Sequence, residues 1–313
     1  MPRVVIIGKG NIGNAVADIL RPKKIDIAFW DTNPKKLIYK HPPARQNFLA
    51  KNLGELAEIV PGADFVFLCV PSFAVPKAVL EMKPCLSRRT VIVSLVKGIE
   101  KKSGATMDEL LHRLVPRSPF ALLSGPMLAG ELSQFMGGAA VIASKNIKAR
   151  NAVMRLFKNT ELRTAESRDI HGVALAGVLK NIYAIILGVA DGTRNGYNAK
   201  GFLFGTAQSE IADIVSFLGG ARETAGIPAL IGDLFATGMS PASNNHALGA
   251  KLFSDVRHQK PPLSTEGMVA APFIAKRLGN QARQFPLFEI AVMLMKQPKE
   301  GRKKLQAFLF GKT

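Results

Sequence analysis

A glycine-rich turn close to the N-terminus restricts the possible fold more than any other feature of the sequence. Residues 4–7 form an apolar β-branched run, which is typical of a strand buried on both faces of a parallel sheet. The turn Gly8-Lys9-Gly10-Asn11-Ile12-Gly13 follows directly, and a helical stretch over 14–20 leads to a second strand-like run over 25–30. Strand, glycine turn, helix and strand in this order predict a βαβ unit that binds a dinucleotide, as in Rossmann domains.

The glycines and one acidic residue have separate roles in such a unit. Gly8 permits the tight turn, Gly10 lets the backbone approach a pyrophosphate, and Gly13 lets the helix pack closely on the strand. The N-terminus of the helix then meets the phosphates. Asp31 closes the second strand, where a carboxylate accepts hydrogen bonds from the adenosine ribose and repels the additional phosphate of NADP. The sequence therefore predicts NAD over NADP, although Asp31 could also simply begin the turn at 31–34.

Further apolar runs extend the strand pattern across the first half of the chain. They predict strands at 65–70, 91–95, 121–123, 139–143 and 162–164. From residue 169 onward the apolar residues recur at helical spacing instead, over 170–189, 202–218 and 285–295. We therefore expect an α/β Rossmann domain with a doubly wound, mostly parallel sheet at 1–167, and an all-α substrate and catalytic domain at 168–313.

Two loops after predicted strands are candidates for the nicotinamide end of the cofactor site. They are residues 71–73 and 97–100, and they follow the third and fourth strands. Ligands of open α/β sheets bind at the carboxyl ends of the strands, which is where these loops would lie. Residues 259–262, with the sequence Gln-Lys-Pro-Pro, read as an exposed loop.

The chain is strongly basic, with a formal net charge of +19 and a pI of about 10.1. Such a charge suits an anionic ligand, a nucleic acid or an acidic membrane surface. The basic residues occur in short groups, however, without interleaved aromatic residues or a recognisable nucleic-acid module. We therefore interpret them as solvated surface charge, with a polyanion site as the alternative, and expect no nucleic-acid partner.

Cysteine usage and hydropathy indicate the compartment. The two cysteines, Cys69 and Cys85, lie in or beside apolar stretches and read as buried thiols of a reducing compartment. We expect neither a disulfide framework nor a metal ion. The longest apolar runs fall short of the roughly 20 residues that a membrane span needs, and no signal-peptide pattern precedes the first strand. These features predict a cytoplasmic protein without a membrane span, and they are compatible with a homodimer.

The sequence resembles the NAD(P)-dependent glycerol-3-phosphate dehydrogenases over nearly its whole length. The resemblance rests on separate blocks, namely the glycine turn, Val70-Pro71-Ser72, Lys97-Gly98-Ile99-Glu100, Ser124-Gly125-Pro126 with Ala129 and Glu131, Leu179-Lys180-Asn181, Gly232-Asp233-Leu234 with Thr237, Ser243 with Asn245, and Glu266-Gly267. It implies reversible reduction of dihydroxyacetone phosphate to glycerol 3-phosphate by NADH or NADPH. It also implies a Rossmann domain joined to an all-helical domain.

The resemblance further implies roles for individual residues. Lys180 would transfer the proton, and Lys97 would lie between the substrate oxygen and the nicotinamide. Asp233 would be a catalytic residue that, with Asn181, orients the reacting centre. The substrate contacts would come from Gly125, Asn181, Thr237, Ser243, Asn244 and Asn245. The cofactor contacts would come from Gly8, Gly10, Asn11, Ile12, Gly13, Asp31, Lys97, Ala129 and Glu266.

Elementary chemistry favours the same use of the two lysines. Oxidation of a secondary alcohol needs a base for the hydroxyl proton, and reduction of the ketone needs an acid for the carbonyl oxygen. A lysine can serve both directions if burial and a second cation lower its pKa, and Lys97 could be that cation for Lys180. The alternative is an ordinary surface lysine, but Lys180 interrupts the apolar run over 172–187, which favours a buried position.

Two positions depart from the family pattern at the polar end of the substrate. The family has an arginine directly after the serine that Ser243 matches, and this chain has Asn244. A hydroxyl residue is also usual where this chain has Met127. Each change removes polar binding capacity, so either the substrate lacks a phosphate or a nearby cation compensates. The candidate cations are His246, Lys200 and Lys251.

Three functions therefore remain open at this point. The first is a glycerol-3-phosphate dehydrogenase, with a small phosphorylated triose or glycerol as substrate. The second is a related dehydrogenase that acts on a different small hydroxy compound. Asn244, which replaces the phosphate-binding arginine of the family, is the residue that distinguishes these two functions. The third is a protein that binds NAD or a polyanion without turnover, against which the presence of both Lys97 and Lys180 argues.

Overall fold

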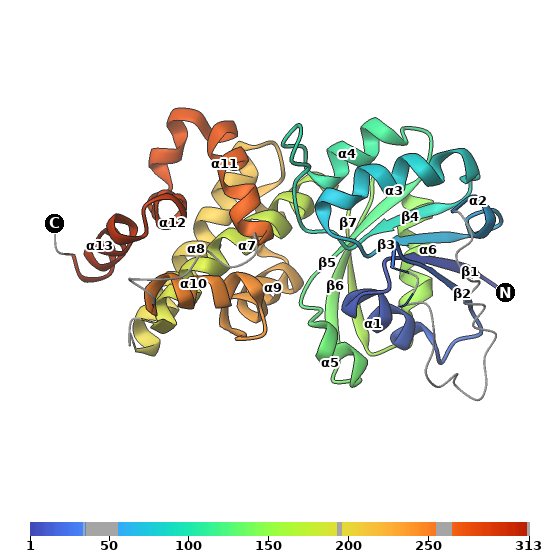
Figure 1. Ribbon diagram of the computed structural model, residues 1–313, viewed down its shortest axis with the longest axis horizontal. Coiled ribbons are helices and arrows are strands. Elements are labelled where there is room, and N and C mark those ends of the chain that lie inside the picture. Colours follow the sequence, from blue (N-terminus) through green and yellow to red (C-terminus); the bar gives the residue numbers. More distant parts are fainter. Residues whose placement is uncertain (34, 36–55, 193–195, 255–264, 312–313) are drawn as a thin grey trace. The chain divides into compact units, whose positions relative to one another are not determined.

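The computed structural model describes residues 1–33, 35, 56–192, 196–254 and 265–311 (Figure 1). The predicted loop at 259–262 lies outside these described residues. By internal packing the chain forms two compact units. The first contains residues Met1–Val96 and Met107–Ile170, and the second contains Lys97–Thr106 and His171–Thr313.

A seven-stranded sheet organises the first unit, in the order β2-β1-β3-β4-β5-β6-β7. Its strands are β1 (Arg3–Ile7), β2 (Asp26–Trp30), β3 (Phe65–Leu68), β4 (Val91–Ser94), β5 (Phe120–Ser124), β6 (Gly138–Ala143) and β7 (Leu162–Ser167). Strands β1 to β5 are mutually parallel, β6 runs antiparallel to β5, and β7 is parallel to β6. The predicted strands and the doubly wound, mostly parallel sheet are thus confirmed, with small shifts at the strand ends.

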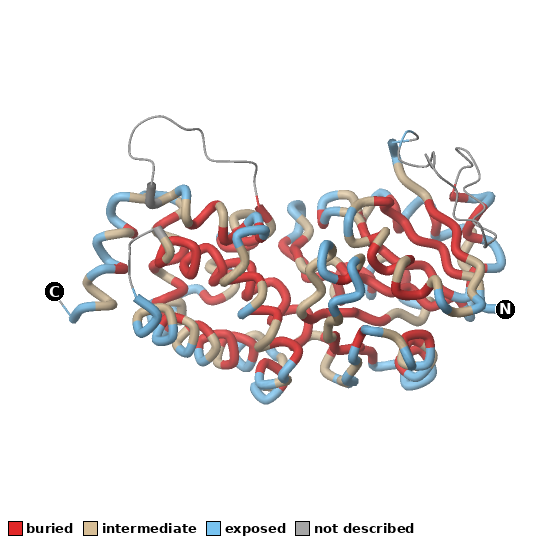
Figure 2. The backbone as a smooth tube through the Cα atoms, turned by 90° about the horizontal axis from the view of Figure 1, so that it is seen from below, coloured by how far each residue is buried: buried red, intermediate tan, exposed pale blue. Residues whose placement is uncertain are grey.

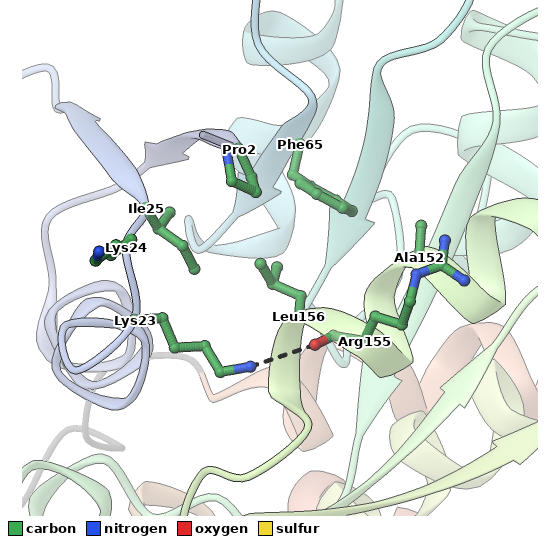
Figure 3. A pocket seen from close by; sticks show the side chains of 8 residues that line it. All are labelled: Pro2, Lys23, Lys24, Ile25, Phe65, Ala152, Arg155 and Leu156. Atoms are coloured by element: carbon green, nitrogen blue, oxygen red, sulfur yellow. Dashed lines mark hydrogen bonds between the residues drawn. The ribbon is translucent and has the colours of Figure 1, made fainter.

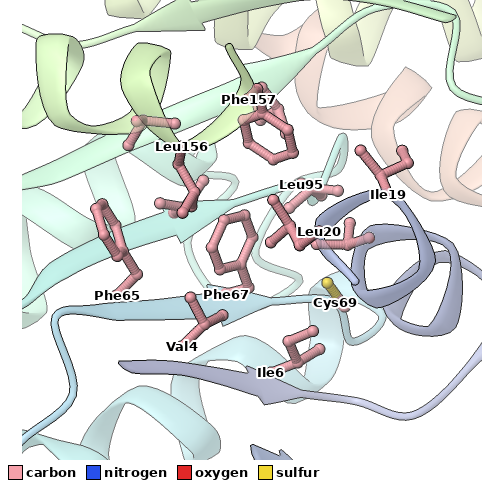
Figure 4. Close-up of a cluster of buried hydrophobic side chains, with 14 of the residues drawn as sticks. Val4, Ile6, Ile19, Leu20, Phe65, Phe67, Cys69, Leu95, Leu156 and Phe157 are labelled. Atoms are coloured by element: carbon pink, nitrogen blue, oxygen red, sulfur yellow. The ribbon is translucent and has the colours of Figure 1, made fainter. Parts of the chain in front are cut away.

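Helices cover this sheet and bury its apolar residues. They are α1 (Asn11–Leu20), α2 (Leu56–Ile59), η2 (Ser72–Ala74), α3 (Val75–Met82), η3 (Lys83–Cys85), α4 (Met107–Leu114), α5 (Ala129–Ser133) and α6 (Ile147–Phe157). Figure 4 shows side chains of α1 and α6 meeting those of β1 and β3 on one face of the sheet. Phe67 of β3 and Phe157 of α6 pack edge to face, with ring centroids 6.1 Å apart.

The second unit is helical, as predicted for the second half of the chain. Its elements are α7 (Ile170–Gly192), α8 (Tyr197–Phe217), η4 (Arg222–Gly226), α9 (Pro228–Met239), α10 (Asn244–Ser254), α11 (Glu266–Leu278), η5 (Gly279–Gln284), α12 (Pro286–Lys296) and α13 (Pro298–Phe310). Helix α7 forms its core, because nearly all its side chains are buried on every side. Figure 2 shows this buried backbone as a red tube within the helical unit.

Helix α7 is long and apolar enough to span a membrane by length and composition alone. Its residues Ile170–Asp191 have a mean hydropathy of 2.0, and the most apolar window is entirely buried within the protein. The uninterrupted apolar runs of the sequence are too short to reveal this candidate. A helix that is apolar all round and covered by other helices is the usual core of a large helical domain.

Two glycines let α7 and α10 approach to backbone contact. A Cβ atom on Gly188 of α7 would lie 2.1 Å from the carbonyl oxygen of His246, and one on Gly249 of α10 would lie 1.9 Å from that of Ile185. Both distances are too short for any side chain. The crossing therefore requires glycine, and it brings the first two turns of α10 against the C-terminal part of α7.

A buried carboxylate fixes the start of α12. The side chain of Glu210 on α8 accepts hydrogen bonds from the backbone N–H groups of Leu287 and Phe288, each at 2.8 Å, and from the Tyr183 hydroxyl at 2.7 Å. Burial raises the pKa of Glu210, and these three donors partly oppose that rise. The carboxylate thereby satisfies orphan donors of the α12 N-terminus and links α7, α8 and α12.

Candidate active site and dinucleotide site

The glycine turn adopts the geometry that its sequence predicts. Gly8 has φ +102°, and a Cβ atom there would lie 2.6 Å from the carbonyl oxygen of Cys69. A Cβ atom on Gly13 would lie 2.0 Å from the carbonyl oxygen of Gly8. The packing of the protein itself therefore requires these two glycines. It does not require Gly10, whose Cβ atom would meet nothing within 4 Å, and this fits a position kept small for the approach of a pyrophosphate.

Asp31 lies at the carboxyl end of β2, next to the glycine turn. Ile7 pairs with Trp30 in the sheet, and the N–H of Gly8 donates to the carbonyl oxygen of Trp30 at 2.7 Å. The Asp31 carboxylate accepts from the backbone N–H of Lys9 and from that of Asn33, both at 2.9 Å. Asp31 therefore does stabilise the turn that it begins, as the alternative interpretation proposed. A carboxylate oxygen can accept more than one hydrogen bond, so this turn role does not exclude a ribose contact.

The other predicted cofactor residues are divided between the units. Asn11 is the exposed first residue of α1, and the half-buried Ile12 follows it. Ala129 begins α5, a helix that packs against α1. Glu266 begins α11 in the second unit, directly after the helix cap Thr265, whose side chain accepts from the N–H of Met268. The prediction that these four residues contact the cofactor remains a prediction.

A hollow of about 280 Å³ in the first unit lies away from the glycine turn. Figure 3 shows its lining side chains, which are Pro2, Lys23, Lys24, Ile25, Phe65, Ala152, Arg155 and Leu156. Pro2 and Ile25 directly precede β1 and β2, so the hollow lies at the amino ends of the parallel strands. Ligands of such sheets bind at the opposite edge, which favours the glycine turn as the dinucleotide site.

In the second unit, two lysines and an aspartate form a buried cluster. The Lys180 ammonium, on α7, donates to Asp233 Oδ1 at 3.0 Å and to Thr237 Oγ1 at 2.6 Å. The Lys97 ammonium donates to Asp233 Oδ2 at 2.6 Å. Asp233 and Thr237 are one helical turn apart on α9 and so face the same side. Three distant parts of the sequence thus supply one charged site.

The cluster tunes the protonation of its members. Burial lowers the pKa of Lys180 to about 8, with the charge of Lys97 acting in the same direction and Asp233 opposing it. Burial alone would raise the pKa of the Asp233 carboxyl, but the two ammonium groups lower it below its usual value. Asp233 therefore stays ionised, while Lys180 can exchange a proton close to neutral pH. A group with this pKa can act as acid or base in a reversible reaction.

A relay of amide groups holds the backbone at Lys97. The N–H of Gly267 donates to Asn245 Oδ1 at 3.2 Å, and Asn245 Nδ2 donates to Asn181 Oδ1 at 3.0 Å. Asn181 Nδ2 donates in turn to the carbonyl oxygen of Lys97 at 2.8 Å. Both asparagines were expected to line the substrate. The structure brings them to the lysine cluster, and it occupies their amides with protein partners.

The remaining residues of the predicted substrate end have different surroundings. Ser243 is buried, whereas Asn244 is the exposed first residue of α10. Gly125, in the first unit, is explained by packing alone, because a Cβ atom there would lie 2.2 Å from the carbonyl oxygen of Ala139. Met127 packs against the apolar cluster of the first unit. The predicted contacts of these residues with substrate stay predictions.

Asp191, at the end of α7, was missed by the sequence analysis. Its carboxylate pairs with His246 Nε2 at 2.7 Å and with the Lys200 ammonium. These are two of the three cations considered as replacements for the missing arginine, and both already share one carboxylate. The only sequence signal was an acidic residue ending a long apolar helix, which resembles an ordinary helix terminus.

The fold and the lysine cluster together define a class of protein. A Rossmann-type sheet with an acidic residue after its second strand supports dinucleotide binding. A buried lysine with a pKa of about 8 has the protonation behaviour that reversible acid–base chemistry needs. These are the features of NAD(P)-dependent dehydrogenases that act on a CH–OH group.

Comparisons with known proteins identify the family. Residues 3–150 match the model of the NAD-dependent glycerol-3-phosphate dehydrogenase N-terminus, and residues 169–306 match that of its C-terminus. A glycerol-3-phosphate dehydrogenase [NAD(P)+] of Clostridium tetani is 33% identical over 258 residues, which cover 79% of this chain and 73% of that protein. The corresponding protein of Acinetobacter baylyi is 32% identical over 263 residues, with coverage of 80% and 73%.

A solved structure agrees over the whole length. The crystal structure of glycerol-3-phosphate dehydrogenase from Coxiella burnetii superposes with a TM-score of 0.87 at 25% identity, and 99% of each chain is covered. The chain belongs to the NAD-dependent glycerol-3-phosphate dehydrogenase family. The resemblance stated from the sequence blocks is thereby confirmed.

Proposed function

We propose that this protein catalyses the reversible reduction of dihydroxyacetone phosphate to glycerol 3-phosphate with NADH. The observation that carries the proposal is the buried Lys180, which has a pKa of about 8 and is bonded to Asp233 and Thr237 in a member of this family. When bound, the nicotinamide supplies or accepts the hydride. The work of the chain is to hold the substrate oxygen and to move its proton.

Lys180 is the proposed acid and base. In the described part of the chain its ammonium donates to Asp233 and Thr237, which accounts for two of its three N–H bonds. The third N–H can point to the carbonyl oxygen of the ketone and protonate it as the hydride arrives at carbon. In the reverse direction the neutral amine takes the proton of the alcohol.

Asp233 and Lys97 support this transfer electrostatically. Asp233 stays ionised and fixes both ammonium groups, each through one of its carboxylate oxygens. Lys97 stabilises negative charge that develops on the substrate oxygen, as a donor oriented before the reaction. Its charge also favours the neutral form of Lys180. The proposed roles therefore need all three residues in their observed arrangement.

The proposed cofactor is NAD(H), with NADP(H) as the weaker partner. Asp31 presents a carboxylate where the adenosine ribose of a dinucleotide would lie. Relatives carry the name glycerol-3-phosphate dehydrogenase [NAD(P)+], which covers both cofactors. The preference for NAD thus rests on the charge of Asp31 alone.

Asn244 favours a second candidate, a dehydrogenase of an unphosphorylated hydroxy compound. The arginine that this position carries in the family would bind phosphate in bidentate fashion. Asn244 cannot do so, and Met127 adds no polar group. One observation argues against this candidate. The chain retains the polar residues of the family at three buried positions of the helical unit, namely Ser243, Asn245 and Thr237.

A substrate panel tests the proposal. Initial rates of NADH oxidation are measured with dihydroxyacetone phosphate and, in parallel, with dihydroxyacetone and other unphosphorylated ketones. We expect the highest kcat/KM for dihydroxyacetone phosphate, with the Lys180→Met variant as the inactive control. A higher kcat/KM for an unphosphorylated ketone would replace the first function by the second. No turnover of any ketone would support the third possibility, binding of a dinucleotide without catalysis.

We also propose a cellular location and an oligomeric state for the protein. The relatives and the fold are those of enzymes with a small-molecule substrate. We propose that this protein acts in the cytoplasm and can form a homodimer. Light scattering after size-exclusion chromatography would give the mass in solution. A mass close to the 33.7 kDa of a single chain would remove the dimer from the proposal.

A further inference from the structure

Lys9, inside the glycine turn, has no role in the function proposed so far. Lys9 is the second residue after β1 and Asp31 the first after β2, and these two strands are neighbours in register, with Ile7 opposite Trp30. The two residues therefore emerge side by side at the carboxyl edge of the sheet. Lys9 is only 8% exposed, which is unusual for a lysine in a surface turn.

The contacts of Lys9 direct it toward β2. Its backbone N–H donates to Asp31 Oδ2 at 2.9 Å. Its ammonium nitrogen lies 5.3 Å from the ring centroid of Phe29, within the range of a cation–π interaction. Phe29 and Asp31 are two residues apart on the same strand end. The side chain thus crosses the end of β2, beside the carboxylate that selects the cofactor.

Lys9 and Asp31 also interact through their charges. Burial lowers the pKa of the Lys9 ammonium, while the negative charge of Asp31 raises it in opposition. By the same attraction, the ammonium reduces the negative potential around the carboxylate. An aspartate with a cation at its side repels a third, anionic group less strongly than an isolated aspartate does.

We propose that Lys9 is a specificity-determining residue, which weakens the discrimination of Asp31 against NADP(H) by placing an ammonium group near the ribose 2′-phosphate. The inference rests on the proposed function only in that the glycine turn binds a dinucleotide. It predicts a site that prefers NAD(H) but still accepts NADP(H). In this proposal Asp31 sets the preference for NAD(H), and Lys9 allows NADP(H) to bind as well.

The test uses two fragments of the cofactors, so that it does not depend on catalysis. Adenosine 5′-monophosphate and adenosine 2′,5′-bisphosphate differ only in the 2′-phosphate, and their Kd values are measured by calorimetry on the full chain. A hydrogen bond to a charged group contributes roughly 1.5–3 kcal/mol, so Lys9→Met should weaken bisphosphate binding about 10- to 150-fold. Monophosphate binding should change less than about 2-fold.

Two control variants show whether an effect of Lys9→Met comes from the charge at position 9. The other possible causes are the net charge of the protein and its folding. Lys9→Arg keeps the cation and should retain bisphosphate binding. Lys24→Met removes one charge from an exposed lysine just before β2, at the opposite edge of the sheet, and should leave both Kd values unchanged. An equal weakening of both fragments by Lys9→Met would make Lys9 a general structural or pyrophosphate residue, and it would overturn the inference. So would unchanged binding of both.

A double-mutant cycle tests whether Lys9 acts next to Asp31. Asp31→Asn should strengthen bisphosphate binding, and its effect should be larger when Lys9 is methionine, because the carboxylate then acts without an opposing charge. Strictly additive effects would contradict the proposed pairing. If the wild-type chain bound neither fragment, the dinucleotide site itself would fall. If the fragments bind but no ketone is reduced, only the proposed catalysis is refuted.

Discussion

Replacement of Lys180 by methionine removes the proposed acid and base while keeping a side chain of similar length in α7. The ammonium donates to Asp233 at 3.0 Å and to Thr237 at 2.6 Å, so the change also removes two hydrogen bonds from the cluster. Asp233 keeps its bond from Lys97 at 2.6 Å and is not left as an unpaired buried charge. We therefore expect the fold to persist, and the loss to fall on catalysis.

The expected size follows from the chemistry of proton transfer. General acid–base catalysis contributes about 10²- to 10⁴-fold, which corresponds to about 2.7–5.4 kcal/mol of transition-state stabilisation. We expect kcat for dihydroxyacetone phosphate to fall by a factor in this range. The Kd for NADH should remain within about 2-fold, because the glycine turn and Asp31 are unchanged.

The pKa of Lys180 also predicts the direction in which kcat/KM changes with pH. Reduction of the ketone needs the ammonium form of Lys180, whose pKa is about 8. The kcat/KM for reduction should therefore be constant below this pKa and fall as the pH rises through it, whereas kcat/KM for alcohol oxidation should rise over the same interval. In Lys180→Met both transitions near pH 8 should disappear.

Steady-state kinetics in both directions, with NADH binding followed by fluorescence, would measure these effects. A denaturant titration checks that the variant is folded. The reasoning is refuted if folded Lys180→Met retains more than about a tenth of the wild-type kcat, or if its pH profile keeps the transition near 8. Either result would move the proton transfer to another residue.

Three further changes test other parts of the site. Asp31→Asn should raise the ratio of kcat/KM for NADPH to that for NADH by at least about tenfold, and an unchanged ratio would contradict the charge argument. Asn244→Arg should lower the KM for dihydroxyacetone phosphate by about 10- to 150-fold, while a KM that stays the same would mean that another cation binds the phosphate or that none is bound. Asn245→Ala breaks the amide relay between Gly267 and Asn181 and should lower the free energy of unfolding by about 1–3 kcal/mol in a denaturant titration, with no loss as the contrary outcome.

The sheet could be predicted from the sequence because its information is local. Each strand that is buried on both faces, such as Val91–Ser94, appears as a short apolar run, and the glycine turn has a fixed spacing. The predicted start of α1 was less accurate. The helix begins at Asn11 rather than at residue 14, because the second half of the glycine turn is already helical and the N–H of Asn14 donates to the carbonyl oxygen of Gly10 at 3.0 Å.

The catalytic cluster could not be derived from local patterns. Lys97, Lys180 and Asp233 meet only through the packing of distant segments, and the family resemblance was the sole source of their association. The loop 97–100 follows β4 as predicted, but the sequence did not indicate that the segment Lys97–Thr106 belongs to the helical unit by its internal packing. There a Cβ atom on Gly104 would lie 2.6 Å from the ring of Phe273.

The hydrogen bond between Asn181 and Asn245 could not be derived from local patterns either. The family resemblance implied that Asn181 and Asn245 contact the substrate. Their mutual hydrogen bond depends on how α7 and α10 cross, which Gly188 and Gly249 permit. Neither glycine has a local signature that distinguishes it from other helical glycines. Only the packed structure revealed that their amides already have partners.

In the proposed reaction this chain transfers a hydride from NADH to dihydroxyacetone phosphate. Incubation with NADH that carries deuterium at the transferable position, followed by mass spectrometry of the product, measures this transfer directly. We predict glycerol 3-phosphate with one deuterium on the carbon that bears the secondary hydroxyl, and its formation should require Lys180. Absence of labelled glycerol 3-phosphate, while a labelled alcohol forms from an unphosphorylated ketone under the same conditions, would contradict the claim.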